Sequence, residues 1–497
     1  MKEIASVSLM RRSDENTIRT KIPSLDLMYR AGVGIFESVN WHGKILIVCG
    51  TGNNAGDGYV VASLLKSKGF FVELLLLAER FSPDGKYYFD RCVKENVPWS
   101  VYNSQNLEGY DIIVDCIFGT GFKGKAENEA KDVIEKINKS GAYVVCADIN
   151  SGLNGDSGLG EACVVSNLTV SVGSLKSGHF LGRAKDVIGR LVNIDIGIDL
   201  IEKPYYLLEA KDTLAVFKER PNFSHKGTYG YITLIGGSTE YSGAVKLANI
   251  AASAMRAGAG VVKLAVPKSL CGGIMPYILE STLCPMAERD GAICFDEDLL
   301  KGALSNIKAA SIGMGLGTRG DNRQVIEYIL NSCQIPVIID ADGLRSFSEI
   351  DKNVIRNSKS TVVLTPHLKE FERLCGVPLT QIQENPIELA KSYAKEMGVI
   401  LLLKGQATVI TDGEEVIISA TGCAGMATAG SGDVLSGILA AVCAYSDNTL
   451  MAVSSGAYIN GLAGELAQAE FGDISMVASD TASYIPRAIK KIKEHTE

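Results

Sequence analysis

Short apolar runs alternate with helix-like segments along the whole chain, and this alternation limits the folds available to it. In the first part, a helical pattern such as GYVVASLLKSKG (58–69) follows each of several apolar runs. The runs that read as buried strands are KILIVCG (44–50), FVELLLL (71–77), DIIVDCIFG (111–119) and AYVVCADI (142–149). Strands separated by helices favour a parallel sheet that is covered on both faces. We therefore predict a doubly wound α/β domain.

The alternation stops in a polar, punctuated stretch near residues 199–229 and then restarts. The second set of expected strands is YITLIGG (231–237), VVKLAVP (261–267), AASIGMGLG (309–317), PVIIDADGL (336–344), TVVLTPH (361–367) and VILLLKG (399–405). The segment at 408–419 reads as a hairpin that turns at Asp412-Gly413, and the last hundred residues are largely helical in pattern. Since 497 residues exceed one ordinary core, we predict two α/β domains, 1–210 and 211–497.

Composition narrows the class of protein. The net charge of −8 disfavours general nucleic-acid binding, which needs clustered Lys and Arg. We see no leader-like start and no apolar run of the roughly 18 residues that a membrane helix needs. The 12 cysteines include no CxxC pair, which is typical of reduced thiols, so we expect a cytoplasmic protein. The five histidines, none at metal-ligand spacing, argue against a zinc site.

A glycine-rich loop follows the first expected strand, in GTGNNAGDGYVVA (50–62). Its glycines allow close approach of the backbone, and N–H groups at the start of the next helix suit a phosphate. Asn53 and Asn54 add amide donors and acceptors. The pattern is neither G-x-G-x-x-G nor a Walker loop, so a plain turn between a strand and a helix is the alternative.

Two further clusters follow later strands. VDCIFGTGFKG (114–124) contains Asp115, and ADINSGLNGDSG (147–158) contains Asp148. The carboxyl ends of parallel strands meet at one edge of a sheet, so Asp57, Asp115 and Asp148 are expected to converge. Such a convergence indicates a general acid or base, a cation site, or both, while helix capping or loop stabilisation is the alternative for each aspartate taken alone.

Together with MRRSDENTI, these segments resemble the epimerase domain of NAD(P)H-hydrate repair enzymes over about residues 1–210. The resemblance implies that Asp148 is the acid/base and that K⁺ is held by Asn54, Asp115 and Ser151. The hydrated dinucleotide would be bound by Asp148 and by two loops: Asn53, Asn54, Ala55, Gly56 and Asp57 in the first, and Gly119, Thr120, Gly121, Phe122, Lys123, Gly124 and Lys125 in the second.

Four positions depart from the usual pattern of that family. Ala55 stands where a glycine is usual, Asn150 where proline is common, and Gly155 and Ser157 replace Ala and Thr. We expect these changes to affect the stiffness of the loops more than their chemistry, with Ala55 alone bearing on the approach of a phosphate.

The strongest single signal is GCAGMATAGSGDVLSGILAAV (422–442), where small residues lead directly into an apolar helix. Backbone N–H groups at such a helix start can stabilise a phosphoryl group in transfer. Asp433 at that start is expected to act as a base on a substrate hydroxyl, with helix capping as the alternative.

Other segments in this half fit the same chemistry. Lys404 in LLKGQAT offers a contact for nucleotide phosphate, and GMGLG (313–317) allows a ligand to approach the backbone. His367 follows a strand and is either functional or structural. His225-Lys226-Gly227 either contacts substrate or forms a capping turn.

GSGD before a helix resembles the ribokinase-like superfamily, and the fuller set is similar to the ADP/ATP-dependent NAD(P)H-hydrate dehydratases over about 220–490. That set is SHKGTYGYITLIGGS, SGA, GMGLG, DADGL, TPHLKEF, LLKGQAT and GMATAGSGDVLSG. By resemblance, Ala244, Gly317, His367 and Asp433 contact the hydrated dinucleotide. The nucleotide, bound with Mg²⁺, would contact Lys404, Gly405, Gln406, Ala407, Thr408, Gly430, Ser431 and Gly432. The departures are Cys423 and Ala424, where Asn and Pro are common, and Ser431 in place of Thr.

The resemblance therefore implies a Rossmann-like three-layer epimerase domain joined to a ribokinase-like dehydratase domain, in a homo-oligomer without a nucleic-acid or membrane partner. Two alternatives remain open: a vitamin or small-alcohol kinase in the C-terminal half, and a non-catalytic binding module in the N-terminal half. The choices between ADP and ATP and between NADH and NADPH hydrates are not readable from the residues.

Overall fold

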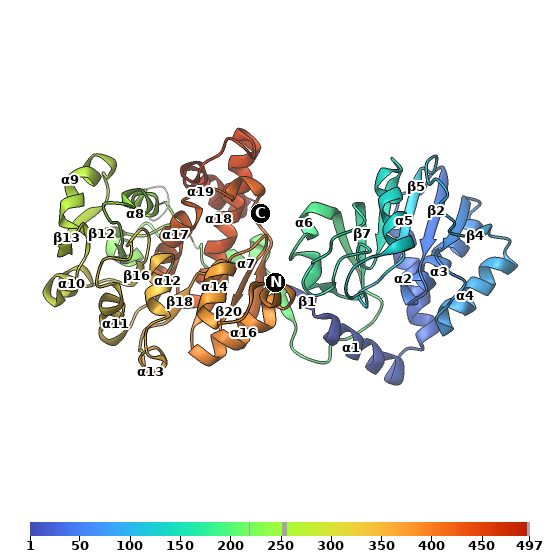
Figure 1. Ribbon diagram of the computed structural model, residues 1–497, viewed down its shortest axis with the longest axis horizontal. Helices are drawn as coiled ribbons and strands as arrows, with labels where there is room; N and C mark the ends of the chain where they lie inside the picture. Colours follow the sequence, from blue (N-terminus) through green and yellow to red (C-terminus); the bar gives the residue numbers. More distant parts are fainter. Residues whose placement is uncertain (218, 251–255, 495–497) are drawn as a thin grey trace. The chain divides into compact units, whose positions relative to one another are not determined.

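The computed structural model describes residues 1–217, 219–250 and 256–494, and the chain divides into two compact units (Figure 1). One unit comprises Glu3–Tyr205, and the other comprises Met1–Lys2 and the chain from Tyr206 onward. Each unit is an α/β fold built on a largely parallel sheet, so the predicted fold class is confirmed. Among the described residues, no helix combines the length and the apolar character needed to cross a membrane.

The sheet of the N-terminal unit is parallel throughout. Its strand order is β4 (Trp99–Val101), β3 (Phe71–Leu76), β2 (Lys44–Cys49), β5 (Ile112–Cys116), β6 (Tyr143–Ala147), β7 (Ser166–Val172) and β9 (Ile188–Ile194). The chain leaves β2 toward β3 and β4 and then returns to the other side of β2 with β5. The order therefore reverses between β2 and β5, and a ligand crevice is expected outside such a reversal.

Helices cover both faces of this sheet. Helices α2 (Ser24–Glu37), α3 (Asn53–Ser67) and α4 (Pro83–Lys94) pack on one face, and α5 (Asn128–Lys139) packs on the other. Helix α3 is apolar on most sides because it lies between the sheet and its neighbouring helices. The remaining elements of the unit are α1 (Val7–Thr20), α6 (Ala184–Val187) and the pairing of β1 (Lys2–Ala5) with β8 (Leu175–Lys176).

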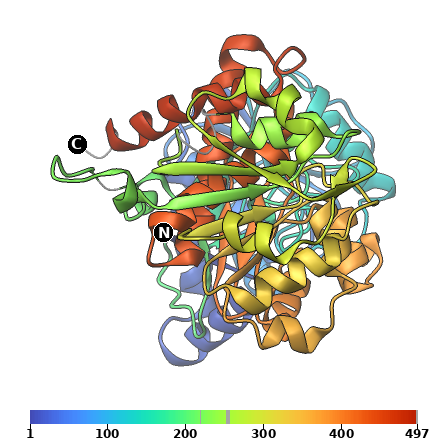
Figure 2. The same ribbon diagram turned by 90° about the vertical axis from the view of Figure 1, so that its left-hand side faces the viewer.

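The C-terminal unit, seen from another side in Figure 2, has a longer sheet. Its order is β13 (Thr282–Met286), β12 (Val261–Pro267), β11 (Tyr231–Ile235), β16 (Ala309–Ile312), β17 (Val337–Ile339), β18 (Val362–Leu364), β19 (Ile400–Leu403), β20 (Thr408–Thr411), β21 (Val416–Ser419) and β10 (Tyr205–Leu207). The strands from β13 to β19 are parallel, whereas β20 is antiparallel to both of its neighbours. The predicted hairpin is confirmed, with Gly413 at its turn in a left-handed conformation (φ 92°).

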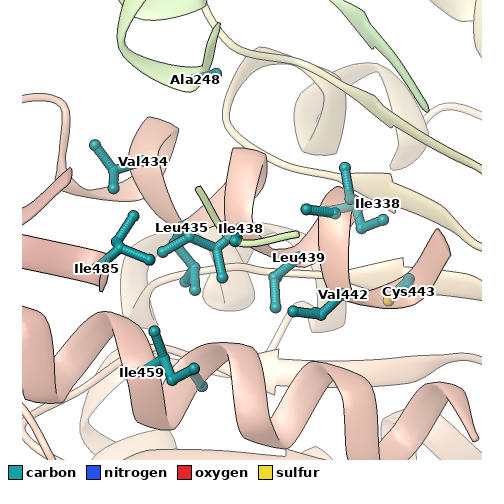
Figure 3. Close-up of a cluster of buried hydrophobic side chains, with 14 of the residues drawn as sticks. Ala248, Ile338, Val434, Leu435, Ile438, Leu439, Val442, Cys443, Ile459 and Ile485 are labelled. Atoms are coloured by element: carbon teal, nitrogen blue, oxygen red, sulfur yellow. The ribbon is translucent and has the colours of Figure 1, made fainter. Parts of the chain in front are cut away.

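The core of this unit surrounds α17 (Ser431–Tyr445), whose side chains from Val434 to Ala444 are buried. Figure 3 shows residues of α17 meeting Ile459 of α18 (Thr449–Phe471), Ile485 of α19 (Ala478–Glu494), Ile338 of β17 and Ala248 of α8 (Ser242–Asn249). The start of α17 is therefore held by several elements at once. The order of strands in this sheet reverses between β11 and β16, so a second crevice is expected there.

The other elements of the C-terminal unit are shorter or more peripheral. They are α7 (Ala210–Thr213), α9 (Cys271–Ile274), α10 (Glu297–Ala303), α11 (Asn322–Ser332), α12 (Asp342–Phe347), α13 (Lys352–Arg356), α14 (Leu368–Cys375), α15 (Leu379–Glu384), α16 (Pro386–Met397) and the hairpin of β14 (Glu288–Arg289) with β15 (Ala292–Ile293). The sequence pattern did not single out β13, which is an edge strand that contains Pro285.

Candidate active sites

In the N-terminal unit, the loops after β2 and β5 lie against each other at the reversal of strand order. A Cβ on Gly50 would lie 2.0 Å from the carbonyl oxygen of Ile117, so only glycine fits there without a shift. Asn54, in the first turn of α3, donates from Nδ2 to the carbonyl oxygen of Phe118 at 3.0 Å. Its Oδ1 is buried and has no hydrogen-bond partner. The double-Asn loop and the second glycine loop therefore form one surface, as convergence at a sheet edge predicts.

Asp115 lies at the end of β5, is fully buried, and accepts several hydrogen bonds. Ser151 donates to it twice, from its backbone N at 2.8 Å and from its Oγ at 2.6 Å. The backbone N of Ile117 and the thiol of Cys146 also donate to this carboxyl group. Burial raises the pKa of Asp115 above its ordinary value, although these hydrogen bonds act in the opposite direction. Asp115 thus ties the loops after β5 and β6 together.

Asp148 follows β6 in a left-handed conformation (φ 65°), which is uncommon for a residue with a Cβ. Its Oδ1 is 2.5 Å from Nζ of Lys176, and its Oδ2 is 3.4 Å from the backbone N of Thr120. Burial would raise the pKa of Asp148, but the Lys176 ammonium outweighs it and holds the pKa below its usual value. Asp148 is therefore an ionised carboxylate that reaches the second glycine loop.

The rest of that second loop is more exposed. The rings of Phe118 and Phe122 stack with their centroids 4.6 Å apart, and Gly124 adopts a positive φ of 87°. Lys123 is exposed, and Nζ of Lys125 pairs with Glu161 at 2.5 Å. The loop thus begins at Gly119, beside Asp148, and ends with two lysines that face solvent.

Asp57 lies just after the first turn of α3 and is partly buried. Its pKa is held well above the ordinary value by burial, by the charge of Asp148 and by Asp14 of α1, against the opposing effect of Lys176. Ala55 and Gly56 are buried behind it, and a Cβ on Gly56 would lie 2.4 Å from Sδ of Met28. Two neighbouring carboxyl groups therefore have pKa values shifted in opposite directions.

In the C-terminal unit, α17 begins after Gly430, which adopts a left-handed conformation (φ 94°). A Cβ at this position would lie 2.3 Å from Cδ1 of Leu247. The Oγ of Ser431 donates to the carbonyl oxygen of Met426 at 2.8 Å and so fixes the entry to the helix. The first N–H groups of a helix have no acceptor within it, which makes this start suitable for an anion.

A buried ion pair lies directly beside this helix start. Nζ of Lys404 is 2.9 Å from Oδ1 of Asp340, a residue that is 2% exposed. A Cβ on Gly432 would lie 3.4 Å from both partners of the pair. Ser436, one turn further along α17, donates its Oγ to Oδ2 of Asp340 at 2.8 Å, and Glu370 lies 3.9 Å from Lys404. Lys404 thus places a positive charge at the helix start and is itself held by Asp340.

Asp433 is in the first turn of α17 and is partly exposed. Burial is the largest influence on its pKa, followed by the charge of Asp340, and together they raise this pKa to about 7 against the effect of Lys404. A carboxyl group with such a pKa exchanges protons readily near neutral pH. This property suits a general base more than a simple helix cap.

The loop after β16 approaches the same end of the sheet. Gly313, Gly315 and Gly317 all have positive φ angles, and a Cβ on Gly313 would lie 1.8 Å from the carbonyl oxygen of Asp340. The backbone N of Gly317 donates to Asp342 at 2.8 Å. Ala244 of α8 lies close to Gly315, since a Cβ added there would be 2.9 Å from the Ala244 methyl group.

The remaining expected contacts vary in exposure. His367 has a half-exposed side chain and caps α14, accepting from the backbone N of Lys369 and Glu370 at Nδ1. Gly405 and Gln406 are exposed, Ala407 is buried, and Thr408 begins β20. His225 accepts from the backbone N of Gly227 at its Nδ1, so its segment forms a capping turn.

Sequence reasoning missed four side chains that shape these sites: Lys176 and His179 in one unit, and Asp340 and Glu370 in the other. A lysine within the run VSVGSLKSGHFLG (170–182), which is otherwise apolar or small, was the available signal for the first pair. The signal for the second pair was that DADGL and TPHLKEF each place a carboxylate after an expected strand.

Two family models match the chain. The one described as NAD(P)H-hydrate dehydratase covers residues 232–487, and the one described as YjeF-related protein N-terminus covers residues 24–178. Together they account for both expected resemblances.

Curated relatives match over nearly the full length. A protein of Moorella thermoacetica named bifunctional NAD(P)H-hydrate repair enzyme is 36% identical, over 96% of this chain and 94% of its own. A protein of the same name from Archaeoglobus fulgidus is 33% identical over 99% of each chain.

A solved structure of the ADP/ATP-dependent NAD(P)H-hydrate dehydratase from Bacillus subtilis, co-crystallised with ATP and Mg²⁺, is also similar. It is 30% identical with a TM-score of 0.50, and the match covers 58% of this chain and 99% of that one. This likeness favours a dehydratase over the alternative of a vitamin kinase.

Proposed function

Because the chain belongs to the family of bifunctional NAD(P)H-hydrate repair enzymes, we propose that each of its two domains, 1–210 and 211–497, carries one of the two activities. The protein epimerises the R and S forms of hydrated NADH or NADPH and dehydrates the S form with ADP or ATP. The pairing of the two activities has a chemical reason. Hydration yields two epimers at the hydroxyl carbon, and a dehydratase that accepts only one of them needs an epimerase to convert the other.

In the epimerase domain, we propose that Asp148 is the acid/base group. Its low pKa and its position beside Gly119 and Thr120 support this assignment. The loops Asn53–Asp57 and Gly119–Lys125 would bind the hydrated dinucleotide, with backbone N–H groups at the start of α3 facing its phosphates.

We propose that K⁺ binds in this domain to Asn54, Asp115 and Ser151. The residues suit the ion, because amide, carboxylate and hydroxyl oxygens are all hard donors. The buried Oδ1 of Asn54 has no protein partner, and this orphan oxygen is the observation that supports a cation there. When bound, the ion would supply a fixed positive charge between the two glycine loops that these three residues belong to or border.

In the dehydratase domain, we propose that Asp433 accepts the proton of the substrate hydroxyl as that oxygen attacks the terminal phosphoryl group of ADP or ATP. As the new O–P bond forms, the terminal P–O bond of the nucleotide breaks and releases AMP from ADP or ADP from ATP. The phosphorylated hydroxyl is a good leaving group, and its loss as inorganic phosphate, together with a proton from the neighbouring ring carbon, restores the dihydropyridine ring. The start of α17 and the adjacent Lys404 would face the negative charge on the phosphoryl group in transfer. Gly405–Thr408 and Gly430–Gly432 would contact the nucleotide, and Ala244, Gly317 and His367 the hydrated dinucleotide.

Mg²⁺ would accompany the nucleotide. Such an ion is typically held by one or two carboxylates together with phosphate oxygens. Asp340 and Glu370 fit this requirement, because both carboxylates lie near one ammonium, Lys404, at the helix start. When bound there, Mg²⁺ would supply positive charge that offsets the charge of the phosphoryl group.

The observation that carries the dehydratase assignment is Asp433, a carboxyl with a pKa of about 7 at the start of a buried helix beside Lys404. The test follows the absorbance of the dihydronicotinamide ring after the protein is mixed with both epimers of NADH hydrate, Mg²⁺ and ADP. A parallel reaction contains ATP, and a control contains no nucleotide.

We expect a nucleotide-dependent rise that passes the level set by the S epimer alone. A rise that stops at that level, within a time too short for spontaneous epimerisation, would leave the dehydratase and make the N-terminal domain a binding module. The absence of any rise with either nucleotide would favour the vitamin-kinase alternative, in which a stable phosphomonoester accumulates.

A further inference from the structure

Lys176 is an almost completely buried lysine, with 1% of its side chain exposed, in the N-terminal unit. Its ammonium group donates to Oδ1 of Asp148 at 2.5 Å, to the carbonyl oxygen of Val172 at 2.7 Å, and to Oγ of Ser171 at 3.4 Å. These three acceptors match the three donors of an ammonium group. Burying a lysine is costly unless its charge is paired, so a purely structural position is better filled by an apolar residue.

His179 fixes the same aspartate from the backbone side. Its Nδ1 accepts from the backbone N of Lys176 at 3.1 Å, which leaves the proton on Nε2. Nε2 therefore donates to the carbonyl oxygen of Asp148 at 2.9 Å. Burial and the Lys176 charge lower the pKa of His179 to about 4, so the ring is neutral and this tautomer persists across the physiological range.

The conformation of Asp148 needs such support. A positive φ at a residue with a Cβ costs about 1 to 3 kcal/mol and persists only where surrounding contacts enforce it. Lys176 holds the carboxylate, His179 holds the carbonyl oxygen, and the backbone N of Val172 donates to Oδ1 at 3.3 Å. Both ends of one strained residue are thus held by a single short segment, 172–179.

The titratable groups around Asp148 come from three elements. Lys176 and His179 are on the segment after β7, Asp57 is on α3, and Asp14 of α1 acts on Asp57. The charge of Asp148 contributes to the raised pKa of Asp57, so Asp57 stays protonated beside the ionised Asp148, and Lys176 favours that ionisation. The ionisation of this site therefore depends on one buried cation.

We propose that Lys176 and His179 are the positioning residues of the epimerase site, which together hold the Asp148 carboxylate in one orientation and in its ionised form. This inference rests on the proposed role of Asp148. It assigns a task to two side chains that do not touch substrate, because Lys176 is buried behind the carboxylate that it holds. Asp148 is then already deprotonated when the substrate binds and can act directly as a base.

The test uses the full-length protein and follows the conversion of the R epimer to the S epimer directly by chromatography. In Lys176→Met, an apolar chain of similar length replaces the cation, and we expect kcat to fall about a hundredfold at neutral pH, with KM changed far less. Without the cation, burial raises the pKa of Asp148, so the remaining activity should recover as pH rises. The wild-type rate should show no such rising limb.

His179 provides a second, independent arm. His179→Phe removes both ring hydrogen bonds, whereas His179→Gln keeps one acceptor and one donor, so Gln should recover part of the activity that Phe loses. Ser63→Ala is the matched control, since it removes another hydrogen bond of this unit, from the buried Ser63 to Glu95, away from Asp148. The dehydratase activity of each variant on the S epimer reports the amount of folded enzyme.

The outcomes separate this inference from the proposed function. If the wild-type protein does not interconvert the epimers, or if Asp148→Asn does so normally, the proposed function itself fails. If Asp148→Asn is inactive but Lys176→Met keeps the wild-type rate and pH profile, the inference is overturned. A loss in Lys176→Met that is equal at every pH would also overturn it, because the cation would then not act through ionisation. If Lys176→Met does not fold, equal rates in His179→Phe and His179→Gln would overturn it.

Discussion

Asp148 and Asp433 are both aspartates at the edge of a parallel sheet, but their surroundings shift their pKa values in opposite directions. Asp148 is paired with a buried ammonium at 2.5 Å, whereas Asp433 lies near the carboxylate of Asp340, whose own ammonium partner is Lys404. Burial raises the pKa of both residues, so the charge of the neighbouring group decides the direction of the net pKa shift. One chain thereby holds a carboxylate that stays ionised and another that titrates near neutrality.

The two activities should therefore depend differently on pH. The pKa of Asp433 is raised to about 7, and a base must be deprotonated to act, so dehydratase kcat/KM should rise about tenfold per pH unit below this value and level off above it. The epimerase rate should stay flat over the same range, because the pKa of Asp148 is lowered. Initial rates of both reactions, measured on one preparation from about pH 5.5 to 8.5 with saturating Mg²⁺ and nucleotide, check this expectation. A dehydratase rate that is independent of pH in this range would contradict the role of Asp433.

At this scale the sequence predicts which carboxylates matter but not what holds them. Asp148 and Asp433 can be picked out because each lies beside glycines at the end of an expected strand or the start of an expected helix. Lys176 is 28 residues from Asp148, and Lys404 is 64 residues from Asp340, so each pairing exists only once the sheet has formed. Lys404 could be marked as a basic residue in a glycine turn, but its burial against Asp340 could not.

The elements that present these residues depend on a few backbone positions. The start of α17 is directed by Gly430, whose φ of 94° and closeness to Leu247 leave no room for a side chain. The loop after β6 is fixed in position by Asn150, which is fully buried. Its Nδ2 donates to the carbonyl oxygens of Val164 and Val187 and to Oγ of Ser166.

Gly430→Ala should impair the dehydratase selectively. The left-handed conformation costs about 1 to 2 kcal/mol for alanine, and the added methyl group also displaces Leu247. The first N–H groups of α17 should then no longer point toward the anion site. We therefore expect dehydratase kcat/KM to fall about tenfold or more and epimerase activity to remain. Gly376→Ala is the matched control, with a similar φ of 71° and nothing within 4 Å of the added carbon. Equal activities in the two variants would mean that this turn does not direct the anion site.

Asn150→Leu should destabilise the N-terminal unit. The substitution leaves the hydroxyl of Thr169, which donates to Oδ1 of Asn150 at 2.6 Å, and three further buried acceptors without their partner. We expect a loss of about 2 to 4 kcal/mol in the free energy of unfolding. Both tryptophans of the chain, Trp41 and Trp99, belong to this unit, so their fluorescence in a urea titration reports on it alone.

The control for that measurement is Asn103→Leu, the same change at an exposed position, which should alter the free energy of unfolding by less than about 0.5 kcal/mol. A similar small effect in Asn150→Leu would refute the structural role of its amide. The position also shows a limit of sequence reasoning. Where proline is common in the family, the Asn reads as a change in loop stiffness, but the structure makes it a buried link between the loop after β6 and the region of β7.

For the whole molecule, the repeated strand–helix alternation predicts the two sheets because both are built from parallel strands with local helical connections. The elements that escape prediction are short or lie at an edge, such as β8 and β13, where pairing rather than pattern defines the strand. Each unit has its own sheet and its own core, one around α3 and the other around α17. Nothing in either site as described requires a residue of the other unit.

The two activities should therefore complement one another between molecules. Alone, Asp148→Asn should convert only the S epimer of NADH hydrate, and Asp433→Asn should form no NADH while still interconverting the epimers. An equimolar mixture of the two variants should convert both epimers completely, because the hydrate is a small molecule that leaves one protein and enters another. The measurement is the final yield of NADH with Mg²⁺ and ADP, taken before spontaneous epimerisation contributes. A mixture that stops at the yield of Asp148→Asn alone would show that the epimer reaches the dehydratase only within one molecule, and loss of both activities in either folded variant would contradict two separate sites.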